Sequence, residues 1–289
     1  MITVLKTAEW LEHHLHEDIP STLLTEITEY STRHLHTLFR KYASISVAGY
    51  IRKRRLTLAS VMLRETKRSV TEIALMYQFD HLQTFSRAFK KQFGISPLQY
   101  RSADSWNMNY YYPSLVVKSF TCRVKTYYFN NDLFLISENR LLYKLNYGYD
   151  FFIRTEDRKI DSYPQVYKDC IHLIFENNHN FPFIISGEVL PGEDSDAIID
   201  IHTGHLTTDN NTQKVTGIPS GFYCCFTNTG TPNDLMKFLS WTKGHGMHQF
   251  KQVLRKGISF TIFNETDMAG IYKADCYIPC IMLTDSARP

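Results

Sequence analysis

An internal repeat, whose two copies stand 50 positions apart, most strongly constrains how this sequence can fold. Residues 35–50, "LHTLFRKYASISVAGY", align with residues 85–100, "FSRAFKKQFGISPLQY". The apolar, basic and turn positions coincide, from Leu35 above Phe85 to Tyr50 above Tyr100. A short helical pattern of apolar residues precedes each copy. The repeat therefore predicts two copies of one structural unit in the first third of the chain.

The second copy indicates what this unit is. Phenylalanines recur every four residues from Phe85 to Phe93, which places them on one stripe of a helix and leaves the basic residues on its other faces. Gly94 stands where a helix can end in a left-handed residue. Ser96 followed by Pro97 is typical of the start of the next helix. Each copy is therefore predicted to form helix, tight turn and helix.

A long helix is predicted between the two copies, over residues 47–66, "VAGYIRKRRLTLASVMLRET". This segment carries a block of four cations at positions 52–55. Residues 4–15 also have apolar side chains at helical spacing and predict a helix that leads into the first copy. We expect residues 1–104 to form an all-α domain of seven helices, with a duplicated helix-turn-helix.

The composition and the apolar pattern of the sequence change after residue 104, which indicates a multidomain chain. Residues 105–120 are polar and aromatic at first and are interpreted as a linker. Residues 121–289 contain short runs of β-branched and aromatic residues, such as "FPFIIS" and "AIIDIHT", and one helical pattern over residues 234–243. This part is predicted to be α+β. The dense tyrosines between 121 and 165 are compatible with either strand or helix.

Composition and charge limit the classes of function. The 289 residues are 43% hydrophobic and 21% charged, which is normal for a folded protein. Residues 1–101 hold 15 Lys and Arg against 9 Asp and Glu, a net charge of +6, whereas the remainder holds 17 against 20, a net charge of −3. This asymmetry predicts that the N-terminal third meets a polyanion. The N-terminus lacks the pattern of a signal peptide, so we expect a cytoplasmic protein.

Two helix-turn-helix units on one rigid body can read successive major grooves of DNA. The segment 73–101, "IALMYQFDHLQTFSRAFKKQFGISPLQYR", contains a Phe-x-x-x-Phe-Lys-Lys-x-Phe-Gly core and a closing Pro-x-x-Tyr-Arg. With this segment, residues 4–101 resemble the AraC/XylS family of bacterial transcription regulators. The N-terminal position of the DNA-binding half resembles the Rob-like group of that family. The resemblance implies a monomer that binds double-stranded DNA and activates promoters by contacting RNA polymerase.

The resemblance also implies which residues contact DNA, with recognition helices over residues 31–41 and 81–93. The expected base contacts are Arg33, His36, Thr37, Leu82, Gln83 and Arg87, because arginine can bind guanine and glutamine can bind adenine through two hydrogen bonds. The expected phosphate contacts are Arg40, Lys41, Lys90 and Lys91, together with the cationic block from Arg52 to Arg55.

The first helix-turn-helix departs from the family pattern at three positions. Thr25 stands where the packing of the two helices usually requires alanine, and Glu29 stands where the turn usually has glycine. Arg33 stands where the Rob-like group has an aromatic residue. The second copy keeps Ala74 at the alanine position, so its base contacts follow the family pattern more closely than those of the first copy.

A second resemblance concerns the end of the chain. Residues 218–243, "IPSGFYCCFTNTGTPNDLMKFLSWTK", with 254–265 and 274–281, are similar to GyrI-like effector-binding domains. The resemblance implies two pseudo-symmetric halves around a pocket for a small apolar or amphipathic molecule. The candidate pocket residues are Tyr223, Phe226, Trp241, Thr261 and Phe263. Thr261 occupies the position where many relatives carry a glutamate that meets a cationic ligand, which argues against a cation here.

Three alternatives to an effector domain remain open. The six cysteines lie beyond residue 121 without a CxxC pair and are most simply reduced core residues; Cys276 with Cys280, and histidine pairs such as His202 with His205, lack zinc-like spacing. An enzyme is also conceivable, but no nucleophile and base can be recognised. The third alternative is a protein-interaction module that sequesters the DNA-binding half. We expect no metal, no cofactor and no catalytic residues.

Overall fold

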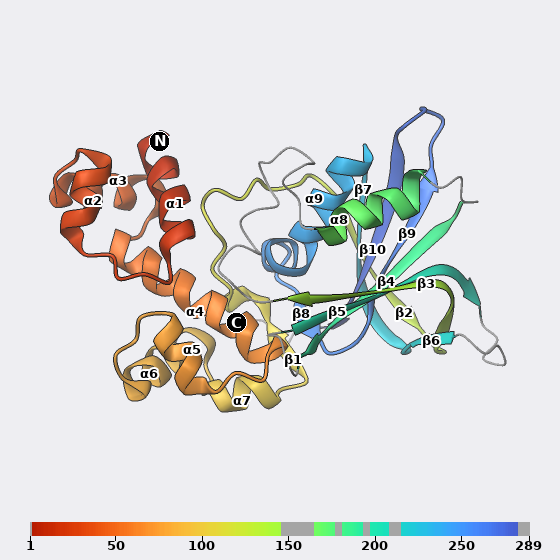
Figure 1. Cartoon of the computed structure of the whole chain (residues 1–289), viewed down its shortest axis with the longest axis horizontal. Coiled ribbons are helices and arrows are strands. Elements are labelled where there is room, and N and C mark those ends of the chain that lie inside the picture. Colours follow the sequence, from red (N-terminus) through yellow and green to blue (C-terminus); the bar gives the residue numbers. More distant parts are fainter. Residues whose placement is uncertain (1, 146–164, 177–180, 193–196, 208–214, 283–289) are drawn as a thin grey trace. The chain divides into compact units, whose positions relative to one another are not determined.

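A computed structural model describes residues 2–145, 165–176, 181–192, 197–207 and 215–282 (Figure 1). The chain forms two compact units. Of the described residues, the first unit holds 2–103 and 110–118, and the second holds 104–109, 119–145 and those from 165 onward. No helix within these described ranges is both long enough and apolar enough to cross a membrane.

The first unit is helical, as the sequence predicted. Residues 2–102 contain α1 (Ile2–His14), α2 (Ser21–Thr28), α3 (Thr32–Ala43), α4 (Val47–Glu65), α5 (Val70–Met76), α6 (Leu82–Phe93) and α7 (Pro97–Ser102). The expected number of seven helices is confirmed. The expected recognition helices correspond to α3 and α6, and the long connecting helix corresponds to α4.

The internal repeat is reproduced in the local geometry. Helices α3 and α6 both have twelve residues and both end in a left-handed residue, Ser44 with a φ of 55° and Gly94 with a φ of 82°. The next helix then begins at a serine cap in both copies. The Ser46 hydroxyl accepts from the Gly49 amide at 3.1 Å, and the Ser96 hydroxyl accepts from the Gln99 amide at 3.3 Å. The predicted roles of Gly94 and Ser96 are therefore confirmed.

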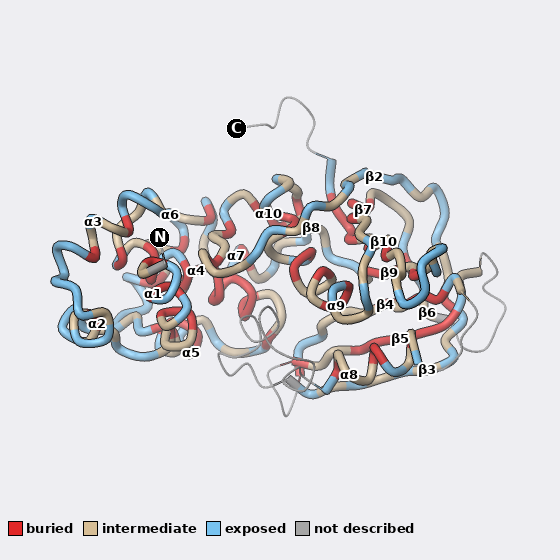
Figure 2. Tube along the Cα trace, turned by 90° about the horizontal axis from the view of Figure 1, so that it is seen from above, coloured by how far each residue is buried: buried red, intermediate tan, exposed pale blue. Residues whose placement is uncertain are grey.

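Helix α4 forms the core of the first unit. All of its residues from Leu56 to Leu63 are buried, and Figure 2 shows buried residues along α4, whereas α2 and α3 are largely exposed or half-buried. Aromatic rings of each copy pack on the helix that follows it, α4 in the first copy and α7 in the second. The Phe89 ring lies 5.2 Å from the Tyr100 ring and the Phe39 ring lies 6.0 Å from the Tyr50 ring.

A buried ion pair joins α1 to α4. Arg54 donates from Nε to Glu12 Oε1 at 2.7 Å and from its second terminal nitrogen to Oε2 at 2.9 Å. The two side chains are 1% and 0% exposed. The Tyr50 hydroxyl also donates to Glu12. Burial, reinforced by the Glu12 carboxylate, raises the pKa of the Tyr50 phenol, so that it remains a hydrogen-bond donor.

Residues 110–115, which we call the anchor segment, pack against α4 within the first unit. Arg54 donates to the carbonyl of Tyr112 at 2.6 Å, and the amide of Tyr112 donates to the Thr57 hydroxyl at 3.0 Å. The amide of Leu115 donates to the Tyr50 hydroxyl at 3.3 Å. Residues that the sequence suggested as a linker thus satisfy polar groups of the helical core.

The second unit is built on an antiparallel sheet. Its strands are β1 (Ser105–Asn107), β2 (Arg123–Phe129), β3 (Leu133–Leu145), β4 (Phe183–Pro191), β5 (Ala197–Thr207), β6 (Val215–Ile218), β7 (Gly221–Gly230), β8 (Val253–Arg255), β9 (Ser259–Glu265) and β10 (Tyr272–Ile281). They pair in the order β1-β8-β10-β9-β4-β5-β3-β6, and β7 adds to β10 and β2 to β7. The described part of the tyrosine-rich segment is therefore strand; residues 146–164 lie outside the described residues.

Helices cover one face of this sheet (Figure 1). They are α8 (Gln165–Ile171), continued by a π-helical turn (His172–Glu176), and α9 (Pro232–Trp241), continued by a π-helical turn (Thr242–Gly246) and α10 (Met247–Gln249). Val166 of α8 and Leu235 of α9 pack with Phe183 and Phe263 of the sheet. The predicted α+β class is consistent with this arrangement.

We predict that Arg54→Met destabilises the protein by about 3–5 kcal/mol, because it leaves the Glu12 carboxylate buried without its partner. The double variant Glu12→Leu with Arg54→Met is expected to recover much of this loss, since no charge is then left buried. Urea unfolding followed by circular dichroism measures both. A loss below about 1 kcal/mol for Arg54→Met would show that the ion pair does not hold α1 on α4.

Candidate nucleic-acid interface

Helix α3 buries one stripe and exposes the side chains expected to meet DNA. Leu35 and Phe39 are buried at 1% and 0% exposure. The nominated residues on the outer face are exposed, except for His36, which is half-buried: Arg33, His36, Thr37, Arg40 and Lys41. The Ser31 hydroxyl caps the helix by accepting from the amide of His34 at 3.3 Å. The first copy thus presents a complete helix with a basic outer face.

The unusual residues of the first turn are accommodated without loss of either helix. Glu29, at the usual glycine position, adopts a left-handed conformation with a φ of 60°. Gln78 does the same in the second copy with a φ of 59°. A left-handed residue with a side chain costs about 1–2 kcal/mol relative to the right-handed form. The Thr25 hydroxyl lies 3.3 Å from the Thr32 hydroxyl, so a polar contact stands where alanine would pack.

Helix α6, like α3, buries its apolar side chains and exposes the side chains expected to meet DNA. Phe85, Phe89 and Phe93 are buried beneath it, at 0% to 5% exposure. All of the residues nominated on this helix are exposed: Leu82, Gln83, Arg87, Lys90 and Lys91. Leu82 is 41% exposed at the first position of the helix.

The cationic block at 52–55 does not form one basic surface. Arg52 and Lys53 are exposed, but Arg54 belongs to the buried ion pair with Glu12. Arg55 donates to the carbonyl of Leu15 at 2.7 Å and to that of Glu17 at 2.6 Å, just beyond the end of α1. Consecutive helical residues point about 100° apart, so the four cations serve different neighbours.

Gln92, on the last turn of α6, was not among the residues nominated from the sequence. Its Nε2 lies 3.3 Å from the Lys53 carbonyl, 3.2 Å from the Thr57 hydroxyl and 3.3 Å from the Tyr110 carbonyl. It therefore joins the second recognition helix to α4 and to the anchor segment. The internal repeat does not predict this role of Gln92, because the corresponding residue of the first copy is Tyr42.

The five candidate pocket residues of the C-terminal part are all buried, and four of them lie on or against one face of the sheet, whereas Tyr223 lies on the other. Phe226, Cys276 and Thr261 lie in one cross-strand row, on the face that also carries Phe263. Trp241 contacts the Phe226 ring at 6.2 Å. Tyr223 lies on the opposite face, because it stands three positions from Phe226 along β7. It packs there in a separate cluster.

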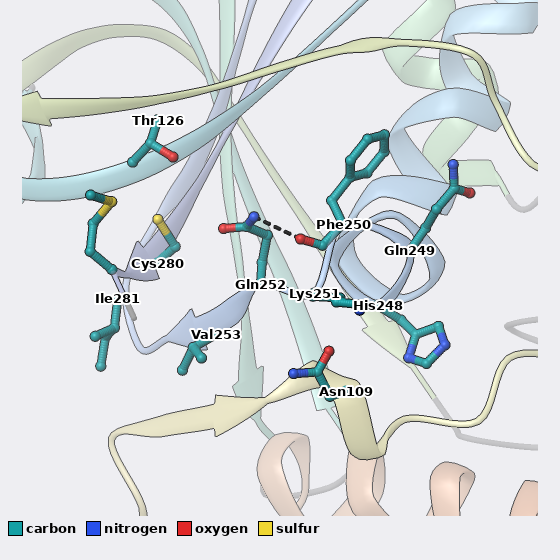
Figure 3. A pocket seen from close by; sticks show the side chains of 11 residues that line it. Asn109, Thr126, His248, Gln249, Phe250, Lys251, Gln252, Val253, Cys280 and Ile281 are labelled. Atoms are coloured by element: carbon teal, nitrogen blue, oxygen red, sulfur yellow. Dashed lines mark hydrogen bonds between the residues drawn. The ribbon is translucent and has the colours of Figure 1, made fainter. Parts of the chain in front are cut away.

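A cavity of about 790 Å³ lies elsewhere in the second unit (Figure 3). Its lining comes from the edge strand β2, the end of β10, the stretch from α10 to the start of β8, and the 3₁₀ turn (Met108–Tyr110) that follows β1. The lining residues include Asn109, Thr126, His248, Phe250, Lys251, Val253, Cys280 and Ile281. The Phe250 ring lies 5.8 Å from the Phe226 ring, so the cavity adjoins part of the expected pocket.

Thiols and histidines do not gather into a metal site in the described residues. No cluster of three or more histidine, cysteine, aspartate or glutamate residues there could hold a metal ion. All six cysteines are free. Burial raises the pKa of the Cys225 and Cys280 thiols to about 11, so both are protonated at neutral pH.

The comparisons with known proteins agree with this architecture. A family model described as a helix-turn-helix domain matches residues 24–103. The Right origin-binding protein of Escherichia coli K12 is 30% identical over 257 residues, which cover 86% of this chain and 85% of that protein. The Transcriptional regulator Rob of Salmonella typhimurium is 40% identical over 112 residues, which cover 39% of each chain. The Putative HTH-type transcriptional regulator YkgA of Escherichia coli K12 is 40% identical over 110 residues, 38% of this chain and 46% of its own length.

A duplicated helix-turn-helix with two exposed basic helices defines a DNA-binding protein of the regulator class. The similarity to the Right origin-binding protein extends through both units. The chain belongs to the AraC/XylS family of DNA-binding transcription regulators.

Proposed function

We propose that this protein is a cytoplasmic transcription activator that binds an asymmetric DNA site as a monomer. Helices α3 and α6 enter successive major grooves, and RNA polymerase is the partner at the promoter. The support is the geometry of one compact unit, in which two twelve-residue helices with matching ends expose basic faces and bury their apolar stripes around α4. A twelve-residue helix is about 18 Å long, enough to cross the major groove.

Within this proposal, base reading and phosphate binding fall to different side chains. Arg87 and Gln83 read base edges from α6, and Arg33 and Thr37 do so from α3. Arg40, Lys41, Lys90, Lys91 and Arg52 hold the phosphates, which sets the register without reading sequence. Arg55 contributes less than the sequence suggests, since it donates to two carbonyls near the end of α1.

We predict that Arg87→Ala removes most sequence preference, whereas Lys91→Ala weakens binding to every duplex. Loss of a bidentate base contact costs about 1–3 kcal/mol on the specific site, and loss of one phosphate contact reduces the salt slope by about one unit. Fluorescence anisotropy on a site selected from a randomised pool, and on random DNA, measures both effects across a salt series. An equal loss on both duplexes for Arg87→Ala would contradict the assigned base contact.

We propose further that the second unit binds a small amphipathic effector in the cavity of Figure 3. Its volume is within the usual range of about 300–1,000 Å³ for small-molecule sites. Phe250, Val253 and Ile281 provide an apolar wall, and Asn109 and Thr126 provide hydrogen-bonding groups. None of the lining residues is acidic and Lys251 is basic, so the cavity favours a neutral or anionic ligand over a cation.

We predict that Thr126→Trp abolishes ligand-dependent stabilisation, because the indole fills the cavity from the exposed edge strand β2. The matched control is Tyr128→Trp, which lies two residues along the same face and does not line the cavity. Thermal unfolding in a panel of amphipathic sulfonates and quaternary ammonium compounds measures the effect. Stabilisation of the wild type by sulfonates alone, lost in Thr126→Trp, is the expected result. No stabilisation by any compound would favour the alternative of a protein-interaction module.

A further inference from the structure

We propose that Gln92 is a positioning residue for DNA reading, which fixes the second recognition helix against α4 and the anchor segment. The inference rests on the proposed reading of bases by α6. It implies that the working DNA-binding unit extends through the anchor segment, beyond the boundary at residue 104 that the sequence suggested. Gln92 itself makes no base contact in this account.

The first step is the geometry of the amide. One nitrogen, Gln92 Nε2, reaches the backbone of α4 at Lys53, the Thr57 hydroxyl and the backbone of the anchor segment at Tyr110, each within 3.2–3.3 Å. The three acceptors come from two separate segments, α4 and the anchor segment, and the two N–H groups of the amide are shared among them. A helix held at this point cannot rotate about its axis without breaking these contacts.

The second step is that the acceptors are themselves held. The Thr57 hydroxyl accepts from the Tyr112 amide at 3.0 Å, and Arg54 donates to the Tyr112 carbonyl at 2.6 Å. The Lys53 ammonium lies 4.8 Å from the centre of the Tyr112 ring. Arg54 is in turn held by its ion pair with Glu12. The groups that accept from Gln92 are therefore connected, through Tyr112 and Arg54, to this buried ion pair. Rigid acceptors make the orientation of α6 definite.

The third step is the distance from Gln92 to the reading residues. Arg87 and Gln83 lie five and nine residues before it on the same helix, which is about 7.5 Å and about 13.5 Å along the axis. A bidentate contact to a base tolerates little rotation of the helix that carries it. Fixing the end of α6 therefore fixes the angle at which Arg87 and Gln83 meet the bases.

The first copy has no glutamine at the position that corresponds to Gln92. Tyr42 occupies the position that corresponds to Gln92, and it is 47% exposed, with the Lys41 ammonium 5.4 Å from its ring. Thr57 and Tyr110 thus serve α6 through a contact that the repeat does not duplicate. The two recognition helices are equivalent in length and ends but differ in how firmly their last turn is held.

The test uses the full chain with Gln92→Met, which keeps the length of the side chain and removes its donor. We expect the affinity for the selected site to fall about fivefold to tenfold, while the affinity for random duplex stays within about twofold. Thr57→Val should cause a similar fall. The two substitutions share the contact between Gln92 and Thr57, so the loss in the double variant should be smaller than the sum of the two single losses.

Tyr42→Met is the matched control from the first copy and should leave the ratio of specific to random affinity within about twofold. An unchanged ratio for Gln92→Met, with a wild type that selects a site, would overturn the inference and leave the proposed function standing. An equal loss on both duplexes would also overturn it, since that indicates a folding defect. A wild type that selects no site at all would instead refute the proposed function.

Discussion

The buried pair of Glu12 and Arg54 is the interaction on which the DNA-binding unit depends. Two charges removed from water are tolerated only where hydrogen bonds satisfy them in full. The Glu12 carboxylate accepts hydrogen bonds from both Arg54 and Tyr50. The remaining guanidinium nitrogen of Arg54 donates to the carbonyl of Tyr112. These requirements can be met in one relative placement of α1, α4 and the anchor segment. The pair therefore specifies the arrangement from which both recognition helices project.

The duplication provides two matching helices, α3 and α6, and their surroundings differ. Helices α3 and α6 share their length, their left-handed ends and the serine cap that follows. Their turns both tolerate a left-handed residue other than glycine, at Glu29 and Gln78. The last turn of α6 is held by Gln92 on α4, whereas Tyr42 leaves the last turn of α3 exposed. Unequal anchoring agrees with the asymmetric DNA site that we propose, in which the contacts made by the two helices need not be alike.

Much of the first unit could be predicted from the sequence, because its signals are local. Apolar spacing gave the stripes of α3 and α6, and Gly94 with Ser96 and Pro97 marked where one helix ends and the next begins. The contacts of Arg54 and Arg55 could not be predicted in this way. Their partners lie 38 to 58 residues distant in the chain. Helical spacing aligns Arg54 with Tyr50 and Leu58 of the same helix, but it does not show that the partner is Glu12 of another helix.

For the second unit, the sequence predicted the α+β class but not the position of the cavity. The alternation of a strand places Tyr223 and Phe226, three positions apart, on opposite faces of β7, but the run "GFYCCFTNTG" is apolar on both faces, so the sequence does not show which face packs with Trp241 and Phe263. The register with β10 places Phe226 in the row that also contains Cys276 and Thr261. The cavity draws Asn109, Thr126, Phe250 and Cys280 from four distant segments, and such convergence leaves no signature in sequence spacing.

Hydroxyl-radical footprinting of the full chain on its selected duplex tests the central claim most directly. The account predicts two protected patches on one side of the DNA, about 10 base pairs apart, with unequal sequence preference beneath them and one chain bound per duplex. A two-fold symmetric footprint with two chains bound, or a single protected patch, would contradict the account of one monomer reading two successive grooves.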